Sequence, residues 1–194
     1  MTAGLRARGL QHAFAGPFDL DVSPGGCLAI TGPSGSGKSL LLRMVADLDP
    51  HEGEAWLDGV GRSTFSGPDW RRHVVYAPAE PGWWLDRVGD HFPAPSPDAA
   101  RLGLSLDIWD RTVAQCSTGE RARLALLRAL AAGPAILLLD EPTGALDQDT
   151  TLAVEALLTE RMLAGLGVVL VTHDTAQAGR LGTLRRRMLA GRLT

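Results

Sequence analysis

The chain has 194 residues, 45% of them apolar and 21% charged, which is ordinary for a globular domain with a substantial hydrophobic core. Its net charge of −3 argues against a dedicated nucleic-acid binder, which would carry a basic face. No apolar run approaches the roughly 20 residues that span a bilayer, no secretory signal is visible, and two cysteines form no disulfide framework or metal pattern. We therefore expect a cytoplasmic protein.

The predicted elements alternate between strands and helices along the chain. Strands are predicted at residues 17–23, 27–31, 53–59, 73–78, 135–142 and 167–174, and helices at 37–48 and 117–133. The runs 135–139 and 167–171 are almost wholly apolar, as in strands of a parallel sheet that is covered on both faces. This order predicts an α/β fold. Residues 81–113 have mixed periodicity and give no clear assignment.

A glycine-rich segment joins the predicted strand 27–31 to the predicted helix 37–48. It matches the pattern G-x-x-x-x-G-K-[ST] throughout, with the residues Gly32, Pro33, Ser34, Gly35, Ser36, Gly37, Lys38 and Ser39. Gly35 and Gly37 allow several backbone N–H groups to converge on a phosphate, and the first turn of the following helix, which includes Leu40, favours the same negative charge. Lys38 is the only lysine beside eighteen arginines, and a compact ammonium fits between β- and γ-phosphates where a guanidinium does not. The segment predicts a nucleoside triphosphate site; the alternative is a flexible Gly/Ser turn.

Polar residues follow the two apolar strands in the second half of the chain. Asp140 and Glu141 end the first strand, and His173 follows the second. An aspartate here can hold Mg²⁺ and a glutamate beside it can activate water, although the pair could instead cap the next helix. A lone histidine is more often structural, but this one is expected at the sheet edge where ligands of open α/β sheets bind.

These motifs, in this order, resemble the nucleotide-binding subunit of an ATP-binding cassette (ABC) transporter over nearly the whole chain. The Walker A motif is "GPSGSGKS", the Walker B motif with its acid is "ILLLDE", the D-loop is "GALD", and the switch histidine lies in "VTHD". The segment "CSTGERARLALLRAL" is similar to the family's signature. The resemblance implies a P-loop NTPase with a RecA-like parallel-sheet core, a small antiparallel β subdomain and a short helical signature subdomain. It implies one domain over 1–194, with a core of 1–79 and 134–194 and a helical subdomain of 80–133.

The resemblance also implies a mechanism. Two copies would sandwich two ATP molecules. Each ATP would lie between the Walker A segment of one copy (residues 32–39, the phosphate cradle) and the signature of the other. Lys38, Glu141 and His173 would act at the γ-phosphate, Asp147 would reach across the interface, and Phe14 would stack on adenine unless it is an ordinary core residue. The signature contacts would come from Ser117, Thr118, Gly119 and Glu120. Mg²⁺ would be held by Ser39 and Asp140.

The chain departs from the family's pattern at three places. The usual hinge Gln is replaced by Ala79, so either Glu80 serves as the Mg²⁺ ligand or it is a solvated loop acid. Thr118 replaces a signature Gly, which is tolerable only where no positive φ is needed. The segment between Ala79 and Cys116 is short for the helical subdomain, and no regulatory extension is expected after the His173 strand.

Two further segments have open interpretations. Trp83 and Trp84, beside the hinge, are either interface anchors for the membrane subunit or buried core residues. "LRRRM" (184–188) is interpreted as a solvated basic turn, with contact to lipid headgroups as a second interpretation.

The resulting prediction is an ATP-hydrolysing subunit, homodimeric or heterodimeric, peripheral to the membrane through a separate permease. A regulatory ABC module with weak or no hydrolysis is the alternative. A soluble ABC machine acting on nucleic acid is disfavoured, because the chain lacks coiled-coil insertions, a second cassette and a basic surface.

Overall fold

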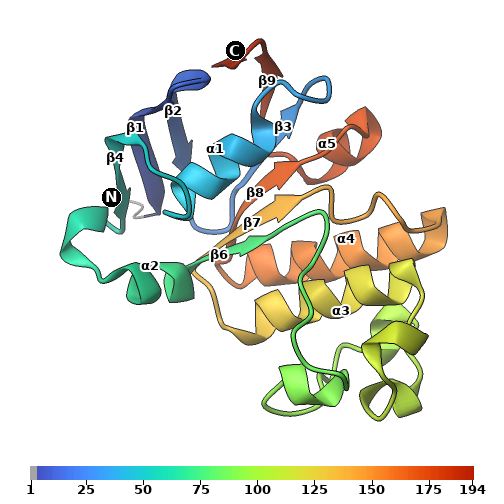
Figure 1. Cartoon of the computed structure of the whole chain (residues 1–194). Coiled ribbons are helices and arrows are strands. Elements are labelled where there is room, and N and C mark those ends of the chain that lie inside the picture. The colour runs from blue at the N-terminus through green and yellow to red at the C-terminus, as the bar shows by residue number, and fades with distance from the viewer. Residues whose placement is uncertain (1–3) are drawn as a thin grey trace.

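The computed structural model describes residues 4–194 as two β-sheets with helices between and below them (Figure 1). The larger sheet has the order β10-β9-β3-β8-β7-β6, in which β3, β6, β7, β8 and β9 are parallel and β10 is antiparallel to β9. Its strands are β3 (Cys27–Thr31), β6 (Val74–Ala77), β7 (Ile136–Asp140), β8 (Gly167–Val171), β9 (Leu184–Leu189) and β10 (Arg192–Leu193). This sheet carries the polar motifs at the ends of its strands.

The smaller sheet is antiparallel, with the order β2-β1-β4-β5. Its strands are β1 (Leu5–His12), β2 (Ala15–Val22), β4 (Glu52–Leu57) and β5 (Val60–Gly61). The antiparallel β subdomain of the expected fold is therefore present, and helix α1 (Lys38–Val45) packs between it and the larger sheet.

Alternation along the central strands divides the interior into two hydrophobic cores. Ile136 and Leu138 of β7 face α1 and the antiparallel sheet, whereas Leu137 and Leu139 face the opposite side. On that opposite side lie α3 (Thr118–Ala131) and α4 (Gln148–Leu163), which Figure 1 shows side by side below the sheet. Burial on both faces explains why β7 is apolar throughout, as predicted.

The remaining helical elements are short. They are α2 (Gly67–His73), α5 (Thr175–Leu181) and the 3-10 turns η1 (Arg62–Thr64), η2 (Gly89–His91), η3 (Ala100–Leu102), η4 (Leu106–Trp109) and η5 (Val113–Gln115). Four of these turns fill the part of the chain whose periodicity was mixed, because 3-10 segments of three or four residues are too short to leave a helical pattern.

The interpretation of residues 184–188 as a basic turn is wrong. These residues belong to β9, which pairs in parallel with β3 from Leu28↔Leu184 to Thr31↔Arg187. Arg185, Arg186 and Arg187 stay exposed within the strand, so the strand lacks the apolar alternation by which sequence patterns are recognised. Pairing with β3, not local preference, makes this segment a strand.

Candidate active site

The P-loop, which is the phosphate cradle of residues 32–39, lies at the carboxyl end of β3, beside the carboxyl ends of β8 and β7. Ile30 pairs with Val171 and Val171 pairs with Asp140, so the P-loop, Glu141 and His173 leave the sheet at the same edge. Ala77, at the end of β6, pairs with Leu139 and brings Glu80 toward this edge as well. Parallel pairing therefore brings together the motifs that the sequence places more than a hundred residues apart.

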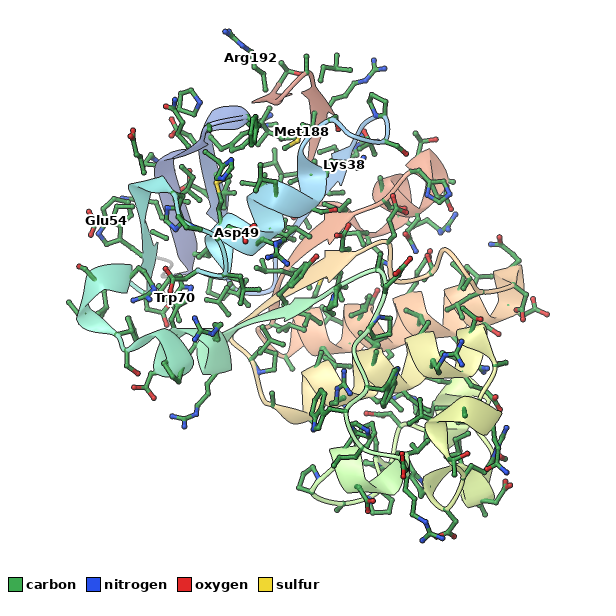
Figure 2. All side chains as sticks on the ribbon, viewed as in Figure 1. Lys38, Asp49, Glu54, Trp70, Met188 and Arg192 are labelled. Carbon is green, nitrogen blue, oxygen red and sulfur yellow. The ribbon has the colours of Figure 1, made fainter. Side chains whose placement is uncertain are left out.

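Two glycines of the P-loop occupy positions that exclude side chains. Gly37 precedes α1 with a φ of 104°, and a Cβ on Gly32 would lie 2.2 Å from the carbonyl oxygen of Met188. Met188 is itself fully buried and lies beside Lys38 and the P-loop in Figure 2. The β9–β10 hairpin also contacts the loop, because the Gly191 N–H donates to the Ser36 carbonyl at 3.1 Å. The cradle is thus shaped by both its glycines and a distant hairpin.

Lys38 is 8% exposed and points back into the cradle. Its Nζ donates to the carbonyl oxygens of Gly32 at 2.8 Å and Pro33 at 2.9 Å. The ammonium therefore lies where the converging loop would hold phosphate, and its two hydrogen bonds fix its direction.

Asp140 is 4% exposed, and its Oδ2 accepts a hydrogen bond from the Tyr76 hydroxyl at 3.0 Å. Burial is the largest cause of the raised pKa of Tyr76, and the neighbouring Asp140 carboxylate raises it further. The phenol therefore stays protonated and remains a donor to Asp140. This bond orients the carboxylate, which is a suitable ligand for a hard cation.

Glu141 and His173 form a close pair. Glu141 Oε2 lies 2.6 Å from His173 Nδ1 and also accepts from the His173 backbone N–H at 3.3 Å. Glu141 has a φ of 50°, in the left-handed region that residues other than glycine rarely adopt, and its own N–H donates to Val171. Such backbone strain persists only where the surroundings hold it, and it is concentrated at functional sites.

The signature residues lie beside the D-loop. Ser117 caps α3: its hydroxyl accepts from the Glu120 N–H at 3.1 Å, and its own N–H donates to the Glu120 carboxylate at 2.7 Å. That backbone N–H and Arg111, at 2.9 Å, hold the pKa of Glu120 below its usual range. Gly119 is close to the loop that precedes α4, since a Cβ there would lie 3.3 Å from the Ala145 carbonyl. Thr118 begins α3 and is absent from the positive-φ positions among residues 4–194, so the condition for its tolerance is met.

Asp147 caps α4, because its carboxylate accepts from the Thr150 N–H at 2.8 Å. This bond lowers the pKa of Asp147. The D-loop aspartate is thus ionised and exposed at the start of a helix, next to the signature rather than next to the P-loop.

Phe14 is 85% exposed, so the alternative of a core residue is wrong. It lies in the turn between β1 and β2, where its ring is tilted against that of His12 with 5.4 Å between ring centroids. The following residue, Ala15, contacts the P-loop, since its Cβ is 3.4 Å from a Cβ built on Gly37. An exposed aromatic ring beside the cradle has a free face for stacking.

Glu80 lines a cavity of about 560 Å³ together with Glu141. The other walls come from α3, through Thr118 and Arg121, and from the loop after β7. Within residues 4–194 no group of three or more His, Cys, Asp or Glu side chains is arranged to hold a metal by itself. Glu80 is therefore near the reaction edge but not part of a preformed cage.

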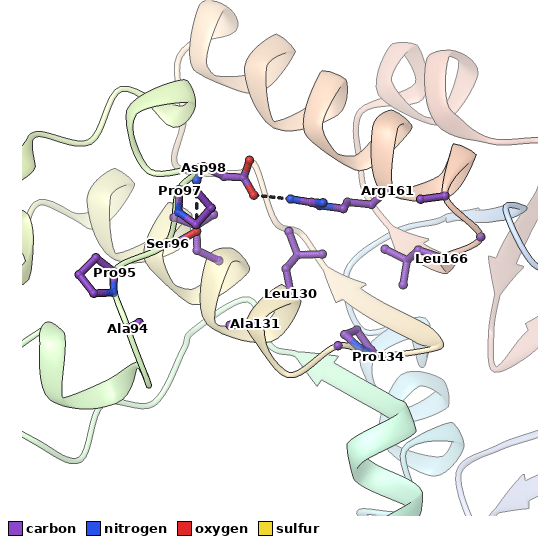
Figure 3. A pocket seen from close by; sticks show the side chains of 14 residues that line it. Ala94, Pro95, Ser96, Pro97, Asp98, Leu130, Ala131, Pro134, Arg161 and Leu166 are labelled. Carbon is purple, nitrogen blue, oxygen red and sulfur yellow. Dashed lines mark hydrogen bonds and ion pairs between the residues drawn. The ribbon is translucent and has the colours of Figure 1, made fainter.

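A second cavity, of about 670 Å³, lies between the C-terminal ends of α3 and α4 and the segment of residues 94–98 (Figure 3). Asp98 crosses it to pair with Arg161 of α4, and also pairs with Arg101 at 3.0 Å. These ion pairs attach the segment of 3-10 turns to the core. None of the predicted site residues lines this cavity.

Residues 16–144 match the family model described as ABC transporter. The chain belongs to the ABC transporter family.

The relatives and solved structures agree with this family. The chain is 37% identical to the aliphatic sulfonates import ATP-binding protein SsuB 2 of Paracoccus denitrificans, over 91% of this chain and 74% of the relative. It is 36% identical to the taurine import ATP-binding protein TauB of Pseudomonas aeruginosa PAO1, over 91% of this chain and 72% of the relative. An ATP-binding cassette solved as a dimer in a post-hydrolysis state, with ADP and Pi bound, matches with a TM-score of 0.82 at 25% identity, over 98% of this chain and 97% of that one.

The protein is therefore an ATP-binding and ATP-hydrolysing ABC subunit with the P-loop NTPase fold predicted from its sequence. The comparisons favour an ATP-hydrolysing transport subunit over a regulatory module, because the relatives above are named as import ATP-binding proteins. None of the helices in the described part of the chain combines the length and apolarity needed to cross a lipid bilayer.

Sequence reasoning missed several contributors to this site. Tyr76, Thr143 and Gln177 were not identified, and neither were the hairpin residues Met188 and Gly191. Tyr76, Gln177, Met188 and Gly191 contact the loops of the site from distant parts of the chain, so no local pattern could have identified them. Thr143 lies between the Walker B and D-loop segments and belongs to neither pattern.

Proposed function

We propose that this ABC subunit drives solute movement through a separate membrane permease by Mg²⁺-dependent ATP hydrolysis between two copies of the chain. The observation that carries the hydrolytic part is the contact of Glu141 with His173, 2.6 Å apart, at the sheet edge that also holds the P-loop. In this assignment Glu141 takes a proton from the attacking water, and His173 orients that carboxylate and faces the γ-phosphate. Lys38 neutralises charge that develops on the β- and γ-phosphate oxygens.

The donors at the cradle fit a magnesium ion. Mg²⁺ is usually bound through one or two carboxylates with substrate phosphates and water, rather than by an all-protein cage. Ser39 and Asp140 supply a hydroxyl and a buried, oriented carboxylate, which would hold the ion against the phosphates. When bound, the ion would supply positive charge that stabilises the transferring phosphoryl group.

Replacing Glu80 by Ala is expected to raise the Mg²⁺ concentration for half-maximal hydrolysis by about threefold to tenfold, because a carboxylate near the ion or its water shell is lost. The Mg²⁺ concentration for half-maximal hydrolysis in Glu80→Gln should fall between the values for wild type and Glu80→Ala. The measurement is ATPase rate against Mg²⁺ at fixed ATP, with the exposed Glu54→Ala as the control. An unchanged Mg²⁺ dependence in Glu80→Ala would identify Glu80 as a solvated loop acid.

A second copy is proposed because, within one chain, the signature residues lie beside the D-loop and not beside the P-loop. Ser117, Thr118, Gly119 and Glu120 lie beside the D-loop at the N-terminus of α3, where the helix N-terminus favours an anion. ATP held by the partner's P-loop would complete this half-site, with Asp147 at the interface. Phe14 would stack on the adenine of the ATP that its own chain's P-loop holds. A homodimer is the simplest arrangement, and a heterodimer with another cassette is the alternative; the dimeric structure of a related cassette supports either.

The permease partner is supported by the names of the relatives, which are import ATP-binding proteins. This assignment places the chain on the cytoplasmic face of a membrane. The surface beside the hinge suits a protein partner, because Trp84 is 68% exposed while Trp83 is partly covered. The Arg128 guanidinium lies over both rings, 4.4 Å from the centroid of Trp83 and 4.7 Å from that of Trp84. The alternative of two buried core tryptophans is therefore wrong for Trp84.

Replacing Trp84 by Ala is expected to reduce copurification with the permease by about tenfold, since an exposed aromatic anchor is lost. ATP binding by the isolated subunit should stay within about twofold, because Trp84 lies outside the cradle. Pull-down with the coexpressed permease measures the first effect, and Leu163→Ala, which removes an even more exposed apolar side chain at the end of α4, is the control. Equal recovery of both variants would move the permease contact elsewhere.

A further inference from the structure

The segment that runs from His173 into α5 contacts the loop of residues 141–147 (the catalytic loop) at two points. The proposed chemistry explains only the first of these contacts. The first is the pair of His173 and Glu141. The second is made by Gln177 of α5, whose Nε2 donates to Thr143 Oγ1 at 2.9 Å. Thr143 lies between Glu141 and Asp147, in the loop that joins β7 to α4.

Gln177 is held in an unusual environment for an amide. It is 1% exposed, and its Nε2 also donates to Glu155 Oε1 at 3.3 Å. Glu155 of α4 is 5% exposed and forms a two-point ion pair with Arg180, at 2.6 and 2.8 Å. Both hydrogens of the amide are therefore used, one on a carboxylate of α4 and one on the hydroxyl of the catalytic loop.

The amide orientation follows from its neighbours. An ionised carboxylate only accepts hydrogen bonds, so the amide atom beside Glu155 must be the nitrogen. The amide oxygen, Oε1, is then buried and accepts no hydrogen bond from residues 4–194.

The loop held by Gln177 is compact, so a shift at Thr143 reaches both of its ends. The Gly144 N–H donates to the Glu141 carbonyl, and the Leu146 N–H donates to the Thr143 carbonyl. Glu141, at one end, has the strained φ described above, and Asp147, at the other end, caps α4. A backbone in a sparsely populated conformation depends on the contacts that surround it.

We propose that Gln177 is a positioning residue for ATP hydrolysis: its hydrogen bond to Thr143 holds the catalytic loop so that Glu141 and Asp147 keep their places relative to His173. The inference rests on the proposed role of Glu141. Gln177 does not touch the P-loop, so it acts on the loop geometry and not on nucleotide affinity.

The test measures kcat, KM and ATP affinity in variants that remove this hydrogen bond from either side. Gln177→Leu and Thr143→Val are each expected to lower kcat by about tenfold, with KM and ATP affinity within about twofold, because tenfold corresponds to one hydrogen bond. The double variant is expected to be no slower than either single variant, because both remove the same bond. Thr143→Ser keeps the hydroxyl and should restore kcat.

Thr159→Val is the matched control. It also removes a threonine hydroxyl bonded near Glu155, since Thr159 Oγ1 donates to the Glu155 carbonyl at 2.8 Å, but it leaves the catalytic loop untouched. It should change thermal stability without changing kcat. If Gln177→Leu fails to fold, the difference in kcat between Thr143→Val and Thr143→Ser still shows whether the hydrogen bond matters for hydrolysis.

Two results would overturn the inference: wild-type kcat in Gln177→Leu or Thr143→Val, or fully additive losses in the double variant. Either result would reduce Gln177 to a packing role while leaving the proposed function intact, provided that Glu141→Gln is inactive. Failure of the proposed function has a different signature, namely full turnover by Glu141→Gln.

Discussion

Replacing Glu141 by Gln is expected to lower kcat for ATP hydrolysis by about 10²- to 10³-fold, the size of effect typical of losing a general base. Gln keeps the length and volume of the side chain but has no carboxylate to accept a proton from water. The P-loop is untouched, so ATP affinity should stay within about twofold. Steady-state hydrolysis with purified subunit and permease gives kcat, and equilibrium binding gives the affinity.

The same variant tests the two-copy arrangement. If ATP closes a dimer that hydrolysis reopens, Glu141→Gln should elute as a dimer with ATP and Mg²⁺ and as a monomer without nucleotide. Glu160→Gln is the matched control, because Glu160 is an exposed glutamate of α4 paired with Arg101 at 2.7 Å. It should behave as wild type in both experiments. A monomer at saturating ATP in Glu141→Gln would argue against the sandwich of two copies, even if hydrolysis is lost.

Replacing Lys38 by Ala is expected to weaken ATP binding by about 100-fold, or roughly 2.7 kcal/mol. The ammonium is 8% exposed and enclosed by the P-loop carbonyls, so its attraction to phosphate is screened little by solvent. Lys38→Arg should fail to restore affinity, because the planar guanidinium needs more room than the enclosed position offers. Binding of a fluorescent ATP analogue measures the effect.

Arg43→Ala is the control for Lys38. Arg43 lies on the same helix and is also cationic, but it pairs with Asp49 at 2.6 Å on an exposed face. That pair keeps the pKa of Asp49 lowered through a direct hydrogen bond. Arg43→Ala should bind ATP normally. Near-normal affinity in Lys38→Ala would mean that backbone N–H groups alone hold the phosphates.

Local patterns predicted the parts of this protein whose residues are adjacent in sequence. The cradle was predicted because its glycines, lysine and serine are consecutive, and β7 and β8 because strands buried on both faces are apolar throughout. The same reasoning missed α4. Its buried residues Val154, Leu157, Leu158 and Met162 have helical spacing, but the exposed Leu152 and Leu163 add apolar residues on the solvent face and blur that pattern. The prediction of a turn at 184–188 was also wrong, because three consecutive arginines do not show a strand pattern, although the segment pairs with β3.

The sequence by itself determined the family, the fold class and the chemical types at the site, because each motif is a short run with its own residue pattern. The tertiary structure alone decided how these groups meet. The contact of Glu141 with His173 and the hydrogen bond from Gln177 to Thr143 join residues about 30 positions apart, and the left-handed backbone at Glu141 lies between these contacts and the sheet. Such contacts arise because parallel strands align their carboxyl ends, and this alignment is set by long-range pairing that local preferences do not encode.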